Sequence, residues 1–213
     1  PVLFALIISI VFAFQVSAYD KTDLMKVKVT GDCADCDLSA ADLSDADLSG
    51  ANLSNANLSD AILRDANLSD AHLSGADLSR AKLSDATLRD ATLYRAYLRD
   101  ANLFGANLRG AYLYRADLRD ADLSEASMNY ANLSGAKLNG ANLRDADLSE
   151  ASMNYANLSG AKLNGANLHG VIGLTVEQLS EARTLYEAEL DPELMEQVKD
   201  KYPHLLEEPE YEE

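Results

Sequence analysis

The stretch CDLSA at residues 36–40 opens a run of five-residue units that ends with ANLHG at residues 166–170. The run from position 36 to position 170 holds 27 consecutive units without a gap. The first residue is Ala in every unit except the one opened by Cys36, and the third is Leu except at Met128 and Met153. A fixed internal period determines the architecture of a whole chain, so this repeat decides the fold.

A period of five fits neither regular secondary structure. Five residues advance an α-helix by about 500°, so a Leu at every fifth position would spiral around it. Side chains of a strand alternate between two faces, so an odd spacing would send successive Leu residues to opposite sides. A backbone that turns a corner every five residues, with Ser, Asn, Asp and Gly at the corners, can bury every Leu in a stack of coils. No proline interrupts residues 36–170, which suits coils joined by backbone hydrogen bonds.

In this pattern the chain resembles the pentapeptide repeat family. The resemblance implies an all-β solenoid, a right-handed quadrilateral parallel β-helix whose inward side chains are the central Leu and the Ala two residues before it. With four units per coil, the 27 units make about seven coils, and a spacing of about 4.8 Å would give a rod of roughly 30 Å. The chain is similar to exported members of the family, which occur in the thylakoid lumen and periplasm of cyanobacteria.

Residues 1–18 are typical of a secretory signal peptide. The stretch from Val2 to Phe14 is almost entirely apolar, and the small residues that follow favour cleavage after Ala18. The segment is shorter than the roughly 20 residues of a membrane span, although a longer form retained as an anchor stays open. We therefore expect a mature chain without a stable span, exported to a periplasm, a thylakoid lumen or the outside of the cell.

Both ends of the repeat run are expected to be capped, because a bare solenoid end exposes unpaired backbone groups. In the N-terminal cap, residues 19–35, alternating Val and Lys predict a brief strand over Leu24–Thr30. In the C-terminal cap, residues 171–206, a capping box at Thr175 precedes apolar residues at helical spacing from Val176 to Leu190. Pro192 begins a second helix, and residues 207–213 form an acidic tail.

Cys33 and Cys36 are the two cysteines of the chain. A structural disulfide that closes the N-terminal cap is the favoured interpretation, since an exported protein meets an oxidising environment. Redox chemistry or free thiols remain alternatives, although a redox CxxC motif belongs to a βαβ setting that is not predicted here. Two cysteines and scattered histidines are too few for a zinc site.

The charge of the chain is −17, and residues 171–213 carry 13 acidic against 3 basic residues. Asp45, Asp65 and Asp85 are four units apart in turn and should form a column that faces water or holds a cation. The sequence contains no catalytic constellation, no phosphate-binding loop and no basic stripe long enough for a nucleic acid. We therefore expect neither an enzyme nor a nucleic-acid-binding protein, and no cofactor or metal.

Arginine and tyrosine replace serine at many outward positions between residues 89 and 119. Arg and Tyr are enriched at interaction hot spots, so we interpret these residues as a partner-binding surface; the alternative is that they stack on each other and stiffen the rod. We call this set the Arg/Tyr belt, and its residues are Arg89, Tyr94, Arg95, Arg99, Arg109, Tyr114, Arg115 and Arg119.

Two function classes follow from these observations. The first is a non-enzymatic exported scaffold that presents side chains on a rigid rod to a protein partner, with self-association as one form of this. The second is a DNA mimic that acts on a type II topoisomerase, as some pentapeptide repeat proteins do. A mimic requires a continuous acidic face and a cytoplasmic location, whereas this chain has arginines within the acidic run and an expected export signal.

Overall fold

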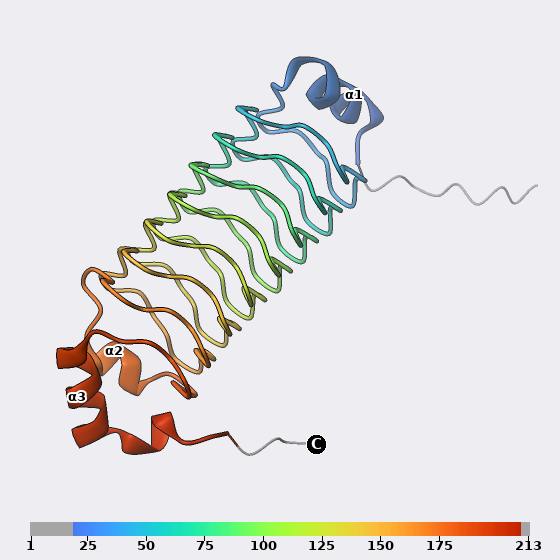
Figure 1. Cartoon of the computed structure of the whole chain (residues 1–213). Coiled ribbons are helices and arrows are strands. Elements are labelled where there is room, and N and C mark those ends of the chain that lie inside the picture. Colours follow the sequence, from blue (N-terminus) through green and yellow to red (C-terminus); the bar gives the residue numbers. More distant parts are fainter. Residues whose placement is uncertain (1–18, 210–213) are drawn as a thin grey trace, which may run out of the picture.

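The computed structural model describes residues 19–209, which form a four-sided rod of stacked coils with helices at both ends (Figure 1). Residues 1–18 and 210–213, and with them the expected signal peptide and the end of the acidic tail, lie outside the described residues. In the described part of the chain, no helix is long and apolar enough to cross a membrane.

The coils pair in parallel with an offset of four units. Asp37 pairs with Asn57, and Asn57 pairs with Asp77, and the same register continues along each side of the rod. The paired residue is always the one before the central Leu, and the two residues after that Leu form a turn. Because a corner interrupts the chain in every unit, the strands are reduced to single bridges instead of extended runs.

Each corner places its last residue in the left-handed backbone region. Asp45 has φ 57° and Gly50 has φ 66°, and the fifth residue of the other units is similar. Gly, Asn and Asp tolerate this region best, which explains their frequency at this position. The corner is also held by a side chain, since the Asp42 carboxylate accepts hydrogen bonds from the backbone N–H of Ser44 at 3.1 Å and from its hydroxyl at 2.8 Å. The repeated Asp/Asn-Leu-Ser sequence is therefore a turn motif.

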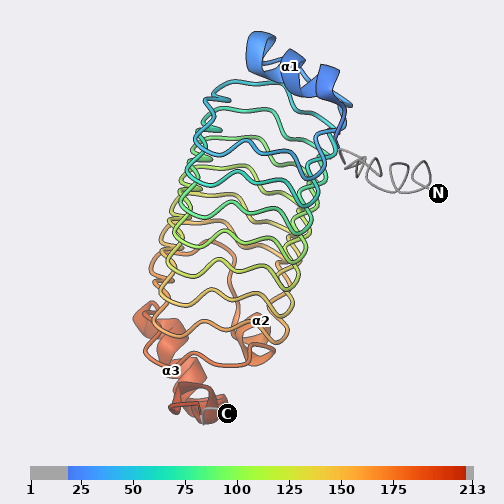
Figure 2. The same ribbon diagram turned by 90° about the vertical axis from the view of Figure 1, so that its right-hand side faces the viewer.

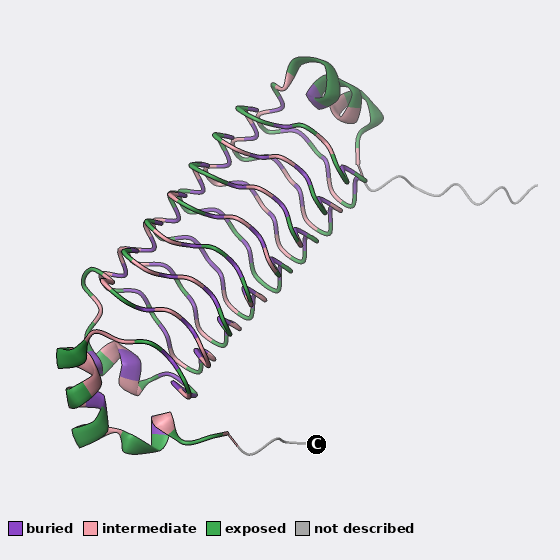
Figure 3. Ribbon diagram, viewed as in Figure 1, coloured by how far each residue is buried: buried purple, intermediate pink, exposed green. Residues whose placement is uncertain are grey.

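The interior of the rod is filled by the first and third residues of the units. Leu98 and its Ala neighbour Ala96 are fully buried, and so are Met128 and Met153, the two substitutes for Leu. Figure 3 shows this burial repeating from coil to coil along the rod. The inward orientation expected for the central Leu and for the Ala two residues before it is confirmed.

The N-terminal end differs from the prediction. The helix α1, Lys21–Thr30, stands where a strand over Leu24–Thr30 was expected, and that expectation is wrong. The Asp20 side chain accepts the N–H of Thr22 and starts the helix, while Gly31 at φ 67° ends it. The solenoid begins one unit earlier than the sequence pattern indicated, because Asp32 already pairs with Asn52 and Cys33 occupies the buried central position.

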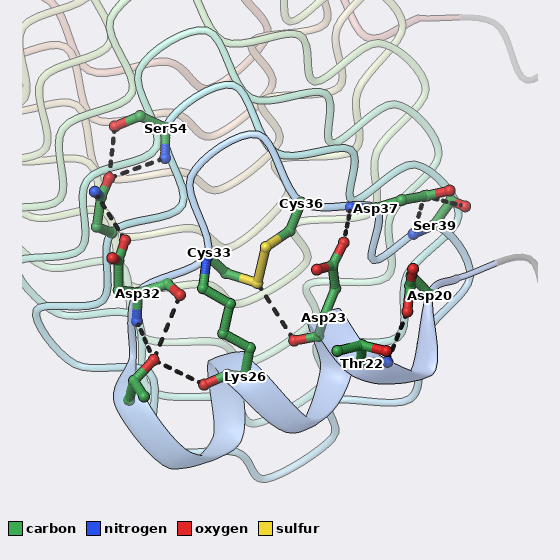
Figure 4. Close-up of a disulfide and its surroundings, with 12 residues drawn as sticks. Asp20, Thr22, Asp23, Lys26, Asp32, Cys33, Cys36, Asp37, Ser39 and Ser54 are labelled. Carbon is green, nitrogen blue, oxygen red and sulfur yellow. Dashed lines mark hydrogen bonds between the residues drawn. A yellow bond between two sulfur atoms is a disulfide. The ribbon is translucent and has the colours of Figure 1, made fainter.

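A disulfide joins Cys33 and Cys36 beneath α1, with a Cα–Cα distance of 5.2 Å. Figure 4 shows the two sulfur atoms between the helix and the first coil, and the carbonyl oxygen of Asp23 lies 3.3 Å from the Cys33 Sγ. The Asp23 carboxylate also accepts the backbone N–H of Asp37 at 2.8 Å. The cysteines fill the positions of Leu and Ala in the repeat, so the bridge lies inside the first coil and next to the cap.

The C-terminal end is only partly helical. The helix α2, Val176–Ser180, has the predicted capping box between Thr175 and Gln178. The prediction of helix from Val176 through Leu190 is wrong beyond Ser180, because Thr184 and Glu189 pair with the preceding coil. Leu185 and Leu190 are five residues apart and so continue the spacing of the repeat. In the sequence, the apolar residues before them predicted a helix that included both.

The helix α2 takes the place of one side of the last coil. The Gln178 side-chain amide donates to the carbonyl oxygens of Met153 at 3.0 Å and Ala156 at 2.9 Å, two carbonyls at the edge of that coil. The helix α3, Pro192–Lys201, and the 3-10 turn η1, Pro203–Leu206, then close the end of the rod (Figure 2). Val198 of α3 and Leu205 of η1 are buried there.

We predict that inward and outward positions differ strongly in tolerance. Leu98→Ala removes a fully buried side chain and should lower the free energy of unfolding by about 2–5 kcal/mol. Leu98→Asp should abolish cooperative thermal unfolding, because the interior offers a charge no partner. Circular dichroism melting measures both. Arg99→Ser, at the exposed next residue, is the control, and equal loss of stability at the two positions would contradict the inward assignment.

Candidate functional site

The Arg/Tyr belt is divided among three of the four corners of the rod. Residues one full coil apart share a corner, so Tyr94, Arg95, Tyr114 and Arg115 form one group, which we call the Tyr94 corner. Arg89 and Arg109 lie on the corner before it, and Arg99 and Arg119 lie on the corner after it. The belt therefore wraps around the rod, and the structure brings only the first group together as a compact surface.

At the Tyr94 corner the aromatic rings stack between coils. The rings of Tyr94 and Tyr114 are 5.4 Å apart and inclined by 17°. Each ring also carries a guanidinium group, since Arg95 lies 5.2 Å from the centre of Tyr94 and Arg115 lies 5.1 Å from the centre of Tyr114. The stacking that the sequence left as an alternative is present, and it favours a position over a tyrosine ring for both guanidinium groups.

The neighbouring corner repeats this arrangement with a tyrosine that the sequence reasoning missed. The guanidinium of Arg109 lies 5.4 Å from the centre of the Tyr130 ring. Tyr130 occupies a corner position with φ 62°, an unusual conformation for a bulky residue. It follows Arg109 by one position more than a full coil, so a search for residues at the coil spacing overlooks the pair.

The belt arginines differ in their carboxylate partners. Arg119 binds Asp117 through two hydrogen bonds of 2.7 and 2.6 Å, and Arg89 lies 3.2 Å from Asp90. Arg99 is 3.6 Å from Asp100, a weaker contact. Within residues 19–209 no carboxylate lies within 4.0 Å of the three arginines that rest on tyrosine rings, which are Arg95, Arg109 and Arg115.

Asp117 is the most buried charged residue of the described rod, at 7% exposed. The hydrogen bond from Arg119 is the main cause that lowers the pKa of its carboxyl group below the usual range, and burial opposes this shift. Lys137, on the next coil, adds a third charge, with its Nζ 3.7 Å from the carboxylate. The carboxylate therefore stays ionised and is neutralised by cations instead of a proton.

A shallow depression of about 400 Å³ lies between the Tyr94 corner and Asp117. Its lining residues are Arg95, Tyr97, Arg115, Asp117, Gly135 and Lys137. Gly135 follows Arg115 on the same corner, and a Cβ there would come within 3.2 Å of the Arg115 Cγ. Lys137 was not among the predicted residues, although its position one coil after Asp117 and two coils after Tyr97 is visible in the sequence.

One group of potential metal ligands is present among the described residues, at the N-terminal end of the rod. Asp23, Cys33 and Cys36 place ligand atoms within 4.8 Å of one another, but both sulfur atoms belong to the disulfide and one carboxylate remains. The column of Asp45, Asp65 and Asp85 does not form such a group among residues 19–209. These residues stand at exposed corners, in the left-handed backbone region that Asp tolerates.

The repeats match a known family. The sequence profile described as pentapeptide repeats matches this chain in eight copies, over residues 32–70, 61–100, 101–140 and 131–170. Among solved structures, the chain is similar to HetL, a pentapeptide repeat protein involved in heterocyst differentiation regulation from the cyanobacterium Nostoc. Identity to HetL is 31%, with a TM-score of 0.50 over 78% of this chain and 92% of that chain.

Two further comparisons place this similarity in context. Rfr23, a pentapeptide repeat protein from the cyanobacterium Cyanothece, is 30% identical, with a TM-score of 0.53 over 54% of this chain and 92% of that chain. QnrB1, a plasmid-mediated fluoroquinolone resistance protein, is 20% identical, with a TM-score of 0.41 over 78% of this chain and 88% of that chain. A search of curated protein sequences finds no match.

We predict that Asp117 stabilises the fold only while it is ionised. Its lowered folded-state pKa means that this stabilisation is present above the unfolded pKa and is lost as the pH falls through the folded one. Asp117→Asn should cost about 1–2 kcal/mol of unfolding free energy at neutral pH, and the difference from the parent should shrink as the pH falls below the usual range of an Asp carboxyl group and through the lowered folded-state pKa. Chemical denaturation across this pH range measures it.

Asp60→Asn is the matched control for this variant. Asp60 accepts two hydrogen bonds from Arg80, at 2.9 and 2.6 Å, but the side chains are 49% and 60% exposed. Solvent weakens such a pair, so its loss should matter less. A difference between parent and Asp117→Asn that persists in strong acid would show that the pair with Arg119 is not its source.

Proposed function

The chain belongs to the pentapeptide repeat family, and on this premise we propose that it is a non-enzymatic scaffold that binds a protein partner through the Arg/Tyr belt. Members of the family fold as right-handed quadrilateral β-helices and generally serve as scaffolds rather than catalysts. The proposal assigns the binding role to outward residues, because the inward residues of the rod are already used for packing.

The observation that carries this proposal is at the Tyr94 corner, where the guanidinium groups of Arg95 and Arg115 lie over tyrosine rings. The same corner on the two preceding coils has Ser54-Asn55 and Ser74-Gly75, so the fold does not require Tyr and Arg there. Placing Arg95 and Arg115 on adjacent coils costs electrostatic repulsion, and no carboxylate of the described residues forms an ion pair with either. An anionic partner would offset that repulsion.

The corner is also rigid, which favours binding. The backbone N–H of Gly75 donates to the Tyr94 carbonyl at 2.9 Å, and the N–H of Arg95 donates to the Tyr114 carbonyl at 3.0 Å. Each coil is held by the coils before and after it, and the tyrosine rings favour one position of each arginine side chain. A pre-organised surface loses little conformational entropy on binding, so a modest contact area can suffice.

Charge supports selectivity for an anionic surface. The chain as a whole carries −17, whereas residues 86–119 hold six Arg against Asp90, Asp100 and Asp117. A partner with an acidic patch would be repelled by most of the rod and attracted to the belt. The same arginines interrupt the acidic surface that a DNA mimic would need, so the scaffold function is the better supported of the two.

We place the scaffold outside the cytoplasm. The composition of residues 1–18 favours a cleaved signal peptide. The disulfide between Cys33 and Cys36 suits an oxidising compartment such as a periplasm or thylakoid lumen. These two features are independent of each other, since one precedes the solenoid and the other lies inside its first coil.

We predict that the Tyr94 corner is required for partner binding and dispensable for folding. Tyr94→Ser and Tyr114→Ser restore the residue of the earlier coils, and Arg95→Asn and Arg115→Asn follow Asn55, which suits their φ of 55° and 57°. The fourfold variant should melt like the parent but lose the partner. Affinity capture from the native compartment, followed by mass spectrometry, makes the comparison.

The control is Arg64→Ser with Arg144→Ser, which removes two arginines from the opposite corner of the rod. This variant should recover the same partner as the parent. If the fourfold variant also recovers it, the belt is not the binding surface. Sedimentation of the purified protein identifies self-association, in which case the recovered partner is a second copy of the chain.

We predict that the native protein is processed and oxidised. Its first residue should be Tyr19, and neither Cys33 nor Cys36 should react with an alkylating reagent before reduction. N-terminal sequencing and mass spectrometry of protein isolated with thiols blocked give both results. A chain that retains residues 1–18 would contradict cleavage after Ala18, and quantitative labelling of both thiols would contradict export to an oxidising compartment.

A further inference from the structure

We infer that the depression beside the Tyr94 corner is a binding site for one phosphate-type oxyanion. This inference rests on the proposed function in one respect, because two of its cations, Arg95 and Arg115, belong to the Arg/Tyr belt. It goes further by naming the chemical group that is recognised and by adding Lys137, which lies on the adjacent flat side of the rod.

Three cationic side chains from three successive coils line this depression. Arg95 and Arg115 follow one another on the corner, and Lys137 comes from the coil after them. The two tyrosine rings hold the guanidinium groups at 5.2 and 5.1 Å, so the arginines cannot turn away without losing that contact. Gly135 leaves open the place where a corner side chain would otherwise stand.

The single carboxylate in the depression does not cancel this positive charge. Asp117 is held by two hydrogen bonds from Arg119, at 2.7 and 2.6 Å, so its charge is already balanced by that arginine. The nearest contact of Lys137 with it is longer, at 3.7 Å. Arg95, Arg115 and Lys137 therefore remain available to an incoming anion, in a protein whose overall charge repels anions elsewhere.

The arrangement fits a compact dianion better than a carboxylate or a polymer. A phosphate group carries about two negative charges and three oxygens that accept strong hydrogen bonds, which matches three separate cationic donors. The cluster is also short. On the flat side it is bounded by Asp77 before Tyr97 and by Asn157 after Lys137, so a chain of phosphates would find no continuation along the rod.

The test is a titration of the isotopically labelled full chain with inorganic phosphate, followed by amide NMR at constant ionic strength. Saturable shifts should centre on Arg95, Arg115, Gly135 and Lys137. Acetate at the same ionic strength should not produce them. Shifts that are spread over the whole rod, or that acetate reproduces, would overturn the site.

Lys137→Asn is the decisive variant, since Asn occupies the equivalent position at Asn157 on the following coil and at Asn57 on an earlier one. It should weaken phosphate binding by about tenfold, as expected for the loss of one charge-assisted contact. Lys162→Asn makes the same change in charge on another side of the rod and should leave the affinity within about twofold of the parent. Equal effects of the two variants would mean that only net charge matters, and would overturn the inference.

Further measurements distinguish this inference from the proposed function. If Lys137→Asn binds no less phosphate than the parent, the oxyanion site is wrong, whether or not the fourfold belt variant still loses its protein partner. A short phosphoserine peptide and its unphosphorylated form identify the source of the group. Tighter binding of the phosphopeptide than of inorganic phosphate indicates a phosphorylated partner, and preference for the inorganic ion indicates a free ligand.

Discussion

The hydrogen bond between successive coils is the interaction on which the rest of this structure depends. Along the rod, the N–H of a central Leu donates to a carbonyl group of the next coil. The acceptor is the residue before that coil's central Leu, as from Leu98 to Asp117 at 2.7 Å. The N–H of the preceding residue donates in the opposite direction, as from Tyr97 to the Ala76 carbonyl at 2.9 Å. This two-way pairing fixes the offset of four units, and the offset determines which side chains are neighbours. The interior that the stacked coils enclose is filled by Leu and Ala side chains, which are closely packed there.

The same offset turns sequence spacing into surface columns, and the columns explain the electrostatics. Like residues meet one coil apart, which would be unfavourable for charges on an exposed corner. In the column of Arg95 and Arg115, the guanidinium groups lie over the rings of the tyrosines beside them. Where a carboxylate lies low on a flat side, Arg119 and Lys137 surround it, as at Asp117. The cation–π contacts and the buried ion pair of the described rod therefore all lie within the few coils that contain residues 94–137.

The two ends of the rod differ from its middle, because the terminal coil at each end has no further coil to pair with its backbone N–H and C=O groups. At the N-terminal end α1 lies over the first coil, and Asp23 takes the N–H of Asp37. At the C-terminal end the Gln178 amide replaces a backbone N–H at two carbonyls of the last coil. In these segments the sequence was least informative. Alternating Val and Lys suggested a strand where Asp20 and Gly31 delimit a helix, and Leu185 and Leu190 fitted two periods at once.

The sequence by itself indicated the solenoid, its period, the inward Leu residues and the position of the Arg/Tyr belt, because a backbone that turns a corner every five residues can bury every Leu. It also indicated the cysteine pair and the boundary of α3 at Pro192. Only the tertiary structure decided which belt residues lie together, since the belt falls on three corners. It also revealed Lys137, which lines the depression beside Gly135, and Tyr130, whose ring contacts Arg109 from one position beyond a full coil. The physical reason is that backbone pairing follows the repeat, whereas side-chain contacts between coils depend on the length and direction of each side chain.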